Sequence, residues 1–557
     1  MEACVNDRVS PAWIWTAWAL ALVAVMLLVA ANLVFGNLNQ DEGWYLYAAW
    51  QVFSGKMPYR DFAFTQGPVL PCFYALFYPA IQSGGLAAGR LVTAALALAG
   101  TLIAAGLAGR IAPPGRARLA AAMVFALALV NVYQVYFCTV VKTYSLALFF
   151  ITAGFLALHC ALERRSGILT MIAAALLALA AGTRSSAALA LPVVLFLLWL
   201  KRNQIGFAGW IYFIFGGGMA AALITLPFLM ESPHNFIYFA GRFHTLREQG
   251  SAASVLVLKA GFLSRVFQAY FVCFAVWVAA MAMRMARAAD GNSAPAPAGG
   301  RSAASLLRTA IWISALAISI VHLGAPFPYD DYQVFIYPLF AIAAALMLVE
   351  QAGARGGQWA LAAVLGLCLV ASFSSPVNQE WIIEKRELIW WRTKDKPPIV
   401  KLRETARLVK SMSGPEDLLL TQDPYLAVEA CRRLPHGLEM GQFSYFPGLD
   451  DHQADAMNVL NRNTFAALLK KCDAPVAALS GYAFAIQSPQ ITPIPAEDRA
   501  FFEGIVSGRY EAAGAVVGFG QAATELRLFR KRGDSAQQAP GRSTRKLNEE
   551  AGTTGNF

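Results

Sequence analysis

Charged residues are scarce in this sequence. Asp, Glu, Lys and Arg make up only 14% of its 557 residues, whereas a soluble domain carries about 25%. Hydrophobic residues make up 57%, and the mean hydropathy is +0.49. This balance excludes an ordinary soluble protein and indicates an integral membrane protein. The formal net charge of +11 comes largely from basic residues in short segments between apolar runs. Since that pattern is typical of membrane topology, nucleic-acid binding is not predicted.

Patterns that bind metal ions are also absent. The eight cysteines are scattered, with no C-x-x-C motif and no Cys/His pair at zinc spacing. The sequence therefore predicts no metal site and no certain cofactor, and it leaves the need for a divalent metal open.

Long apolar stretches dominate the first two thirds of the chain. A bilayer takes about 20 residues to cross. The first stretch, 13–35, is longer than the apolar core of a secretory signal, about 7–15 residues, so we interpret it as a retained span. A shorter stretch with three prolines, 68–82, predicts a partly inserted helix. Ten further candidate spans bring the predicted total to eleven: 87–109, 119–137, 144–161, 167–183, 185–200, 207–230, 262–283, 309–323, 333–349 and 357–373.

Basic residues fall in alternate loops between these stretches. If the N-terminus is cytoplasmic, every such loop is cytoplasmic, as the positive-inside rule requires. An odd number of spans then puts the C-terminal region outside the plasma (inner) membrane, in the periplasm or its equivalent. The loops concerned carry Arg110, Arg116 and Arg118, then Arg164 and Arg165, then Lys201 and Arg202, then Arg284, Arg287, Arg301 and Arg308, and finally Arg355.

The composition changes after about residue 373, which divides the chain. The predicted fold is an α-helical polytopic membrane domain, 1–373, with a low-complexity linker at 290–300, followed by a small extracytoplasmic α/β domain, 374–533. Within the second domain we predict helices at 399–412 and 464–472, strands at 417–422 and 474–480, and a hairpin of 510–520 with 524–532. Cys431 and Cys472 share this domain, and a disulfide between them stays open because nothing in the sequence fixes their distance. The polar tail, 534–557, is predicted to be disordered.

The first outer loop, 36–86, places two carboxylates directly after the first span. Residues 40–68 read QDEGWYLYAAWQVFSGKMPYRDFAFTQGP, so that Asp41 and Glu42 open the loop. The stretch 43–54 has the length of a helix and carries Trp and Tyr rings, which favour the membrane interface. We expect it to lie along the membrane surface over the spans. Two interpretations of Asp41 are open at this point: a cap that complements the helix dipole, or part of a functional site.

A helix cap does not explain the other charges on the outer side. Positive charge is disfavoured there, and charges near the membrane that oppose the topology rule usually serve a site. Several cations with one or two carboxylates suit a substrate with an anionic leaving group and an acceptor hydroxyl. A carboxylate can take the hydroxyl proton while the cations hold a phosphate. The charges concerned are Lys56, Arg60, Asp61, Lys142, Arg184, Arg242 and Arg247.

The order of motifs in this loop resembles a known family. The acidic pair opening DEGWYLYAAW, then G-x-x-P-Y-R-D-F from Gly55 to Phe62, then Gly67 and Pro68, are similar to the membrane glycosyltransferases of the GT-C superfamily. The resemblance is to the family 39/83-like group, which includes protein O-mannosyltransferases and the aminoarabinose and galacturonic acid transferases of lipid A. It covers 13–373, is strongest at 40–68, and extends more loosely to 141–150, 182–192 and 329–340.

This resemblance implies an enzyme that takes a sugar from a polyprenyl-phosphate donor and inverts its anomeric centre. The partners it implies are that donor, membrane lipids, and a glycan, lipid or protein acceptor. The acid at the start of the first outer loop is the proposed base of such enzymes, here Asp41, with Glu42 as an auxiliary. Members often have a second acid in the next outer loop, where this sequence has Lys142, Thr143 and Tyr144. That departure argues against a two-carboxylate or metal-bridged site.

Two groups of residues are predicted to bind the substrates. Some have simpler explanations that stay open: Arg184 as a headgroup anchor, Arg242 and Arg247 as part of an interfacial helix, and Asp330 and Asp331 as turn residues. We assign the donor phosphate to Lys56, Arg60, Lys142, Arg242, Arg247 and Tyr332. We assign the rest of the substrate to Tyr59, Asp61, Tyr144, Arg184, Asp330, Asp331 and Gln333.

The favoured function is therefore glycosyl transfer at the outer face of the membrane. The alternative is a transporter or flippase for an anionic lipid, with the outer cations as its entry funnel. Transporters usually show paired repeats and broken helices at the midplane. This sequence shows no internal repeat, and no acidic residue lies in the middle of a predicted span. A protein that binds a lipid-linked sugar without catalysis fits the same residues and also stays open.

Overall fold

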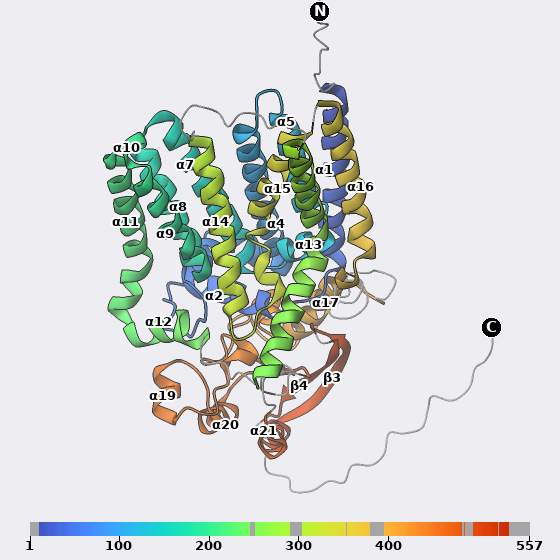
Figure 1. The fold of residues 1–557 in the computed structure, drawn as a ribbon. Coiled ribbons are helices and arrows are strands. Elements are labelled where there is room, and N and C mark those ends of the chain that lie inside the picture. The colour runs from blue at the N-terminus through green and yellow to red at the C-terminus, as the bar shows by residue number, and fades with distance from the viewer. Residues whose placement is uncertain are drawn as a thin grey trace, which may run out of the picture.

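The computed structural model describes residues 11–244, 251–289, 303–352, 354–378, 395–481, 484, 494–521 and 523–533. The first part of the chain is a bundle of α-helices, and the C-terminal elements, including a sheet, lie at the end of the bundle opposite to the start of α1 (Figure 1). The helices of the first part are α1 (Pro11–Phe35), α2 (Gln40–Phe53), α3 (Val69–Ala75), α4 (Tyr78–Ile111), α5 (Ala117–Leu129), α6 (Val132–Thr139), α7 (Thr143–Arg164), α8 (Gly167–Thr183), α9 (Ala190–Leu200), α10 (Arg202–Ile205), α11 (Phe207–Glu231), α12 (Pro233–Ala240), α13 (Ala252–Ala289), α14 (Ala303–Gly324), α15 (Tyr337–Gln351) and α16 (Ala354–Ser374). Short 3-10 turns are η1 (Ser185–Leu189), η2 (Arg242–His244) and η3 (Asp330–Gln333).

Each of the eleven predicted spans coincides with a helix or a helix pair. Within the described residues, seven helices are long and apolar enough to cross a membrane: α1, α4, α7, α11, α13, α14 and α16. The pair α5 and α6 is bent by 74°, at the point where the Asn131 side chain caps α6 by accepting the N–H of Gln134. The remaining apolar helices, α8, α9 with η1, and α15, are shorter. The protein is a multi-pass membrane protein, and the count of eleven spans stays a prediction because these three helices are short.

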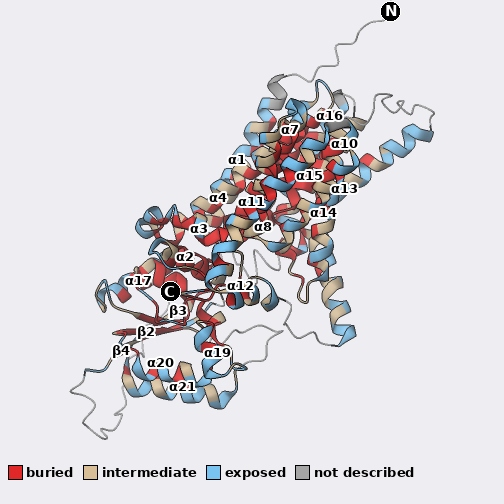
Figure 2. Ribbon diagram, turned by 90° about the vertical axis from the view of Figure 1, so that its left-hand side faces the viewer, coloured by how far each residue is buried: buried red, intermediate tan, exposed pale blue. Residues whose placement is uncertain are grey.

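The outer surface of the bundle is apolar. Side chains such as Leu27, Leu223 and Met230 are largely exposed, whereas buried residues gather between the helices and where the C-terminal elements meet the bundle (Figure 2). Exposed apolar side chains on this scale are the expected lining of a lipid-facing surface.

Helix α2 lies between the bundle and the C-terminal elements. It begins at Gln40 because Asn39 forms a capping box with Glu42: the Asn39 side chain accepts a backbone N–H of the first turn, and the Glu42 side chain accepts the N–H of Asn39. The predicted helix at 43–54 is therefore confirmed, with a start three residues earlier. The stretch 68–82 is not one helix: α3 ends at Ala75, and α4 begins at Tyr78.

The C-terminal elements dock on a break in α4. Gly85 has φ +64°, and a Cβ there would lie 2.0 Å from Oε2 of Glu429. That same oxygen accepts the backbone N–H of Leu86 at 2.8 Å. Glu429 thus satisfies the first donor of the helix that restarts after the break, which ties the C-terminal elements to the bundle.

The C-terminal elements include a four-stranded mixed sheet of order β1-β2-β4-β3. Strands β1 and β2 are parallel, and the other two pairs are antiparallel. The predicted helices, strands and hairpin of this region are found as α17 (Pro398–Ser411), α20 (Arg462–Lys471), β1 (Leu419–Thr421), β2 (Val476–Leu479), β3 (Tyr510–Phe519) and β4 (Thr524–Lys531). Within its described residues the structure adds four elements that were not predicted: α18 (Pro424–Ala430), η6 (Gly441–Ser444), α19 (Asp451–Ala456) and α21 (Ala496–Arg509). Cys431 and Cys472 are both free thiols, so the disulfide left open by the sequence is not formed. The linker 290–300 and the tail 534–557 lie outside the described residues.

Candidate active site

Asp41 lies in the first turn of α2, with its side chain partly exposed. The cap of this helix is Asn39, whose Oδ1 accepts the Asp41 backbone N–H at 3.1 Å. The interpretation of Asp41 as the cap is therefore wrong, and its carboxylate is left for other contacts. Trp44 Nε1 donates to Asp41 Oδ1 at 3.3 Å, which orients the carboxylate.

Glu42, unlike Asp41, is fully buried. Its Oε1 accepts Arg90 Nε at 2.7 Å and the Val141 N–H at 3.2 Å. Its Oε2 accepts Arg90 Nη2 at 2.6 Å and the Asn39 N–H at 3.0 Å. Four hydrogen bonds fill the acceptor positions of one carboxylate. The geometry therefore supports a structural role for Glu42 rather than the auxiliary catalytic one.

Lys142 joins Asp41 to a carboxylate from a distant segment. Its Nζ lies 3.1 Å from Asp41 Oδ2 and 3.1 Å from Asp331 Oδ2. Tyr144 also donates to Asp331 Oδ2, at 2.9 Å. Helix α2, the start of α7 and η3 therefore meet at one point, and four predicted site residues are brought together there.

Arg184 lies beside this group without a carboxylate of its own. Among the described residues no carboxylate is within ion-pair distance of its guanidinium, and its buried Nε has no hydrogen-bond partner. The guanidinium is 4.9 Å from the ring centre of Tyr144 and 4.3 Å from that of Tyr332, and its Nη1 donates to Thr143 Oγ1 at 3.1 Å. A cation held between aromatic faces, with an unsatisfied donor, is suited to bind an anion. We call Asp41, Lys142, Tyr144, Arg184, Asp331 and Tyr332 the acid–base cluster.

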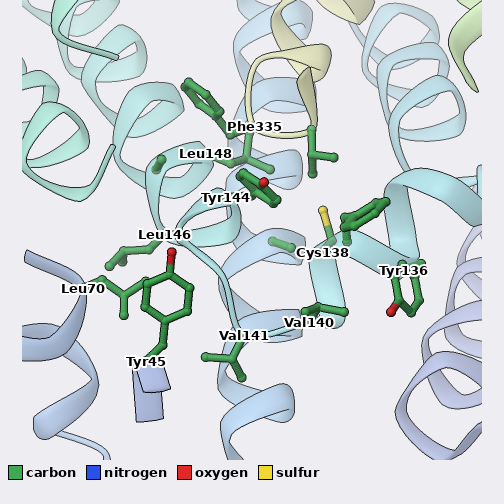
Figure 3. Close-up of a cluster of buried hydrophobic side chains, with 14 of the residues drawn as sticks. Tyr45, Leu70, Tyr136, Cys138, Val140, Val141, Tyr144, Leu146, Leu148 and Phe335 are labelled. Atoms are coloured by element: carbon green, nitrogen blue, oxygen red, sulfur yellow. The ribbon is translucent and has the colours of Figure 1, made fainter. Parts of the chain in front are cut away.

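A group of buried side chains adjoins this cluster and shares Tyr144 with it. Tyr45 from α2, Tyr144 from α7, Val141 and Phe335 come from four segments to form a buried group of side chains (Figure 3). Burial first, and then the Asp41 carboxylate, raises the pKa of the Tyr45 phenol well above its usual value. The phenol therefore stays protonated beside Asp41.

Asp330 and Gln333 take part in neighbouring contacts instead. Asp330 accepts Arg265 Nε at 2.8 Å and the Tyr133 hydroxyl. Gln333 contacts Ser319 at 3.0 Å and His322 at 3.2 Å, within the packing of α14. Both residues shape the segment that presents Asp331 and Tyr332.

The predicted cations of the first loop are not brought to Asp41. Lys56 follows the C-terminal end of α2, and a helix of 14 residues places it roughly 20 Å from the first turn. Arg60 is exposed and pairs with Asp61 at 2.8 Å and with Glu231 at 3.5 Å. Tyr59 is buried with φ +68°, and its hydroxyl donates to the Gln66 carbonyl, so it holds the loop.

Arg242 is exposed in η2. Burial raises the pKa of the nearby Tyr238 phenol, and the positive charge of Arg242 offsets part of that rise. Arg247 lies outside the described residues.

Sequence reasoning missed Arg90, Arg265 and Asn39. The position of Arg90 inside the apolar stretch 87–109 could have indicated a buried ion pair, because an ionisable residue inside such a stretch usually has a partner. Arg265 stands near the start of the stretch 262–283 in the same way. Asn39 preceding an acid three residues later is a capping-box pattern.

Comparison with solved structures relates this arrangement to a known fold. ArnT from Cupriavidus metallidurans in the apo state is similar with a TM-score of 0.56 and 14% identity, over 95% of this chain and 99% of that one. The same protein bound to undecaprenyl phosphate gives a TM-score of 0.54 and 14% identity, over 93% and 98%. The Archaeoglobus fulgidus oligosaccharyltransferase in the apo form gives 0.46 and 11%, over 88% and 73%. No protein-family model and no curated protein matches the sequence. The chain therefore shares the fold of ArnT over nearly the whole length of both chains, which agrees with the fold that the motifs at 40–68 predicted.

Proposed function

We propose that this protein is an inverting glycosyltransferase that moves a sugar from a polyprenyl-phosphate donor to an acceptor at the outer face of the plasma membrane. The observation that carries the proposal is the acid–base cluster, in which the Asp41 carboxylate lies near an arginine that has no carboxylate partner among the described residues. The shared fold supports it, because the ArnT structure is bound to undecaprenyl phosphate, a polyprenyl phosphate.

In this proposal the chemistry is a single displacement. Asp41 accepts the proton of the acceptor hydroxyl as the acceptor oxygen bonds to the anomeric carbon. The bond from that carbon to the phosphate oxygen breaks on the opposite face, so the configuration inverts and polyprenyl phosphate leaves. Arg184, Lys142 and the Tyr332 hydroxyl stabilise the negative charge that develops on the departing phosphate. Lys56, Arg60 and Arg242, which the structure does not bring to Asp41, have no part in this step.

The direct test is transfer of sugar from a polyprenyl-phosphate donor in liposomes. Asp41→Asn keeps a hydrogen-bond acceptor for Trp44 but cannot take up a proton. It is expected to bind donor normally and to transfer at least about 10²-fold more slowly. Glu42→Gln, normalised for folded protein, is expected to keep far more activity than Asp41→Asn. Near-normal transfer by Asp41→Asn contradicts the assignment of the base. Movement of intact lipid-linked sugar across the membrane without transfer by the parent protein supports the transporter instead.

The orientation is tested separately. Our proposal needs the first outer loop and the C-terminal elements on the same, outer side of the membrane. Reporter fusions after residues 60, 250 and 400 are expected to report outside in every case. One cytoplasmic result among them contradicts the proposed topology.

A further inference from the structure

Lys142 bridges the carboxylates of Asp41 and Asp331. The two carboxylates come from the first turn of α2 and from η3, and each has an oxygen 3.1 Å from the same ammonium nitrogen. The Lys142 side chain is only 9% exposed, so the ammonium occupies the space between the carboxylates rather than reaching in from solvent. Its charge also lies near the rings of Phe137 and Tyr144, at 5.6 and 5.7 Å.

A cation between two carboxylates is the arrangement that a divalent ion makes in sites built from Asp and Glu. Here the protein itself supplies that cation. Within the described residues no group of three or more His, Cys, Asp or Glu side chains is placed to hold a metal ion. Because the Lys142 ammonium lies 3.1 Å from both carboxylates, the residues present do not fit a metal ion that bridges them, and they do fit an ammonium, which donates hydrogen bonds to two carboxylates at once.

We infer that Lys142 replaces a divalent metal ion in this protein, that Asp331 is the second carboxylate of the site, and that sugar transfer requires no divalent cation. The inference rests on the proposed function for its statement about transfer, but not for its statement about the cation position. The ammonium compensates the charge of both carboxylates, so that an anionic donor can approach them. It also holds the Asp41 side chain toward the cluster.

The cation position can be tested without any assay of transfer. Lys142→Ala removes the ammonium and leaves two carboxylates facing the same space, so this variant is expected to gain a site for Mn²⁺. Electron paramagnetic resonance of added Mn²⁺ measures the gain. The double variant Lys142→Ala with Asp331→Asn is expected to lose it. Lys401→Ala is the matched control, because Lys401 Nζ contacts only the carbonyls of Val517 and Gly518 among the described residues.

Transfer supplies the second readout. The parent protein is expected to keep its rate within about twofold after treatment with a chelator, and Lys142→Ala is expected to lose about 10²-fold or more, as for a positioned catalytic group, and to regain part of this with Mn²⁺. If chelation abolishes transfer by the parent and Mn²⁺ restores it, the inference is wrong. If Lys142→Ala gains no more Mn²⁺ binding than Lys401→Ala, the ammonium does not occupy a cation position, and the inference is also wrong. A parent protein with no transfer under any condition contradicts the proposed function instead, and the Mn²⁺ result still decides the cation position.

Discussion

Arg90 and Glu42 form a doubly hydrogen-bonded ion pair between α4 and the first turn of α2. Arg90 Nε and Nη2 donate to the two Glu42 oxygens at 2.7 and 2.6 Å, and both side chains are buried. Arg90 Nη2 also donates to the Asn37 carbonyl at 2.7 Å. This pair fixes the start of α2 and leaves the adjacent Asp41 pointing toward Lys142. Two neighbouring acids thus have different environments, which sequence alone did not distinguish.

Glu42→Gln is expected to destabilise the protein strongly. The change leaves the buried Arg90 guanidinium without its counter-charge, and breaking a buried pair in this way costs about 3–5 kcal/mol. A lower melting temperature of the purified protein in detergent is the expected result, while Asp41→Asn melts near the parent. Arg60→Ala serves as the control, because its pair with Asp61 is exposed and contributes little. Equal melting temperatures for Glu42→Gln and the parent would show that the pair does not hold α2.

Arg184→Gln is expected to weaken binding of polyprenyl phosphate by about 10-fold or more, since a hydrogen bond to a charged group contributes about 1.5–3 kcal/mol. Arg60→Gln and Arg242→Gln are expected to change it less than twofold. Binding of the lipid to purified protein, followed by native mass spectrometry, compares the three variants directly. If Arg60→Gln binds the lipid as weakly as Arg184→Gln, the assignment of the phosphate to Arg184 is wrong and the first loop takes part in binding it.

Gly43→Ala is expected to disturb the packing of α2 against α18 of the C-terminal elements. A Cβ at Gly43 would lie 2.3 Å from the backbone nitrogen of Tyr425, so α2 and α18 must move apart, and overpacking of this kind costs about 1–3 kcal/mol. A lower melting temperature and slower transfer are expected, because Asp41 and Trp44 are on the same helix. Gly504→Ala is the control: it lies in α21 with open space around it, and Ala there is expected to stabilise by about 0.5–1 kcal/mol. If the two alanine variants behave alike, the close approach at Gly43 is not required.

Asp423 predicts a pH dependence of stability. Burial raises the pKa of its carboxyl from 3.8 to about 6, despite a hydrogen bond of 2.5 Å from the Tyr425 hydroxyl. Between pH 4 and 6 the folded protein holds a proton that the unfolded chain has lost, so stability falls as pH rises through this window and levels off above it. The loss is on the order of 1–3 kcal/mol. Asp423→Asn, which keeps the acceptor for Tyr425, is expected to melt above the parent at pH 7.5 and to match it at pH 4. A constant difference between the two proteins from pH 4 to 7.5 would contradict this assignment.

Much of the architecture was predictable because it follows from local patterns. Each apolar stretch that was expected to span the membrane coincides with a helix or a helix pair of the bundle. The strands at 417–422 and 474–480, the helix at 399–412 and the terminal hairpin followed from short apolar runs, amphipathic spacing and turn residues. The break in α4 at Gly85 was not predicted, because it depends on Glu429, which is contributed by a helix more than three hundred residues later.

The motifs of the first loop were sufficient to single out Asp41 as a candidate site residue and to indicate the fold, because both inferences depend on residues that are close together in the sequence. The partners of that residue depended on tertiary structure. Lys142 and Asp331 are 189 positions apart, and Glu42 and Arg90 are 48 apart, so no local pattern pairs them. The cations of one short loop looked equivalent in the sequence. In the structure the length of α2 separates Lys56 from Asp41, and Arg60 pairs with Asp61 and Glu231, while η3 brings Asp331 and Tyr332 to the cluster. Composition and periodicity indicate which elements form, since the spacing of apolar residues and the turn residues between them are local properties of the sequence. Which charges meet is decided only when the helices pack, because a buried charge must find its partner wherever the fold places one.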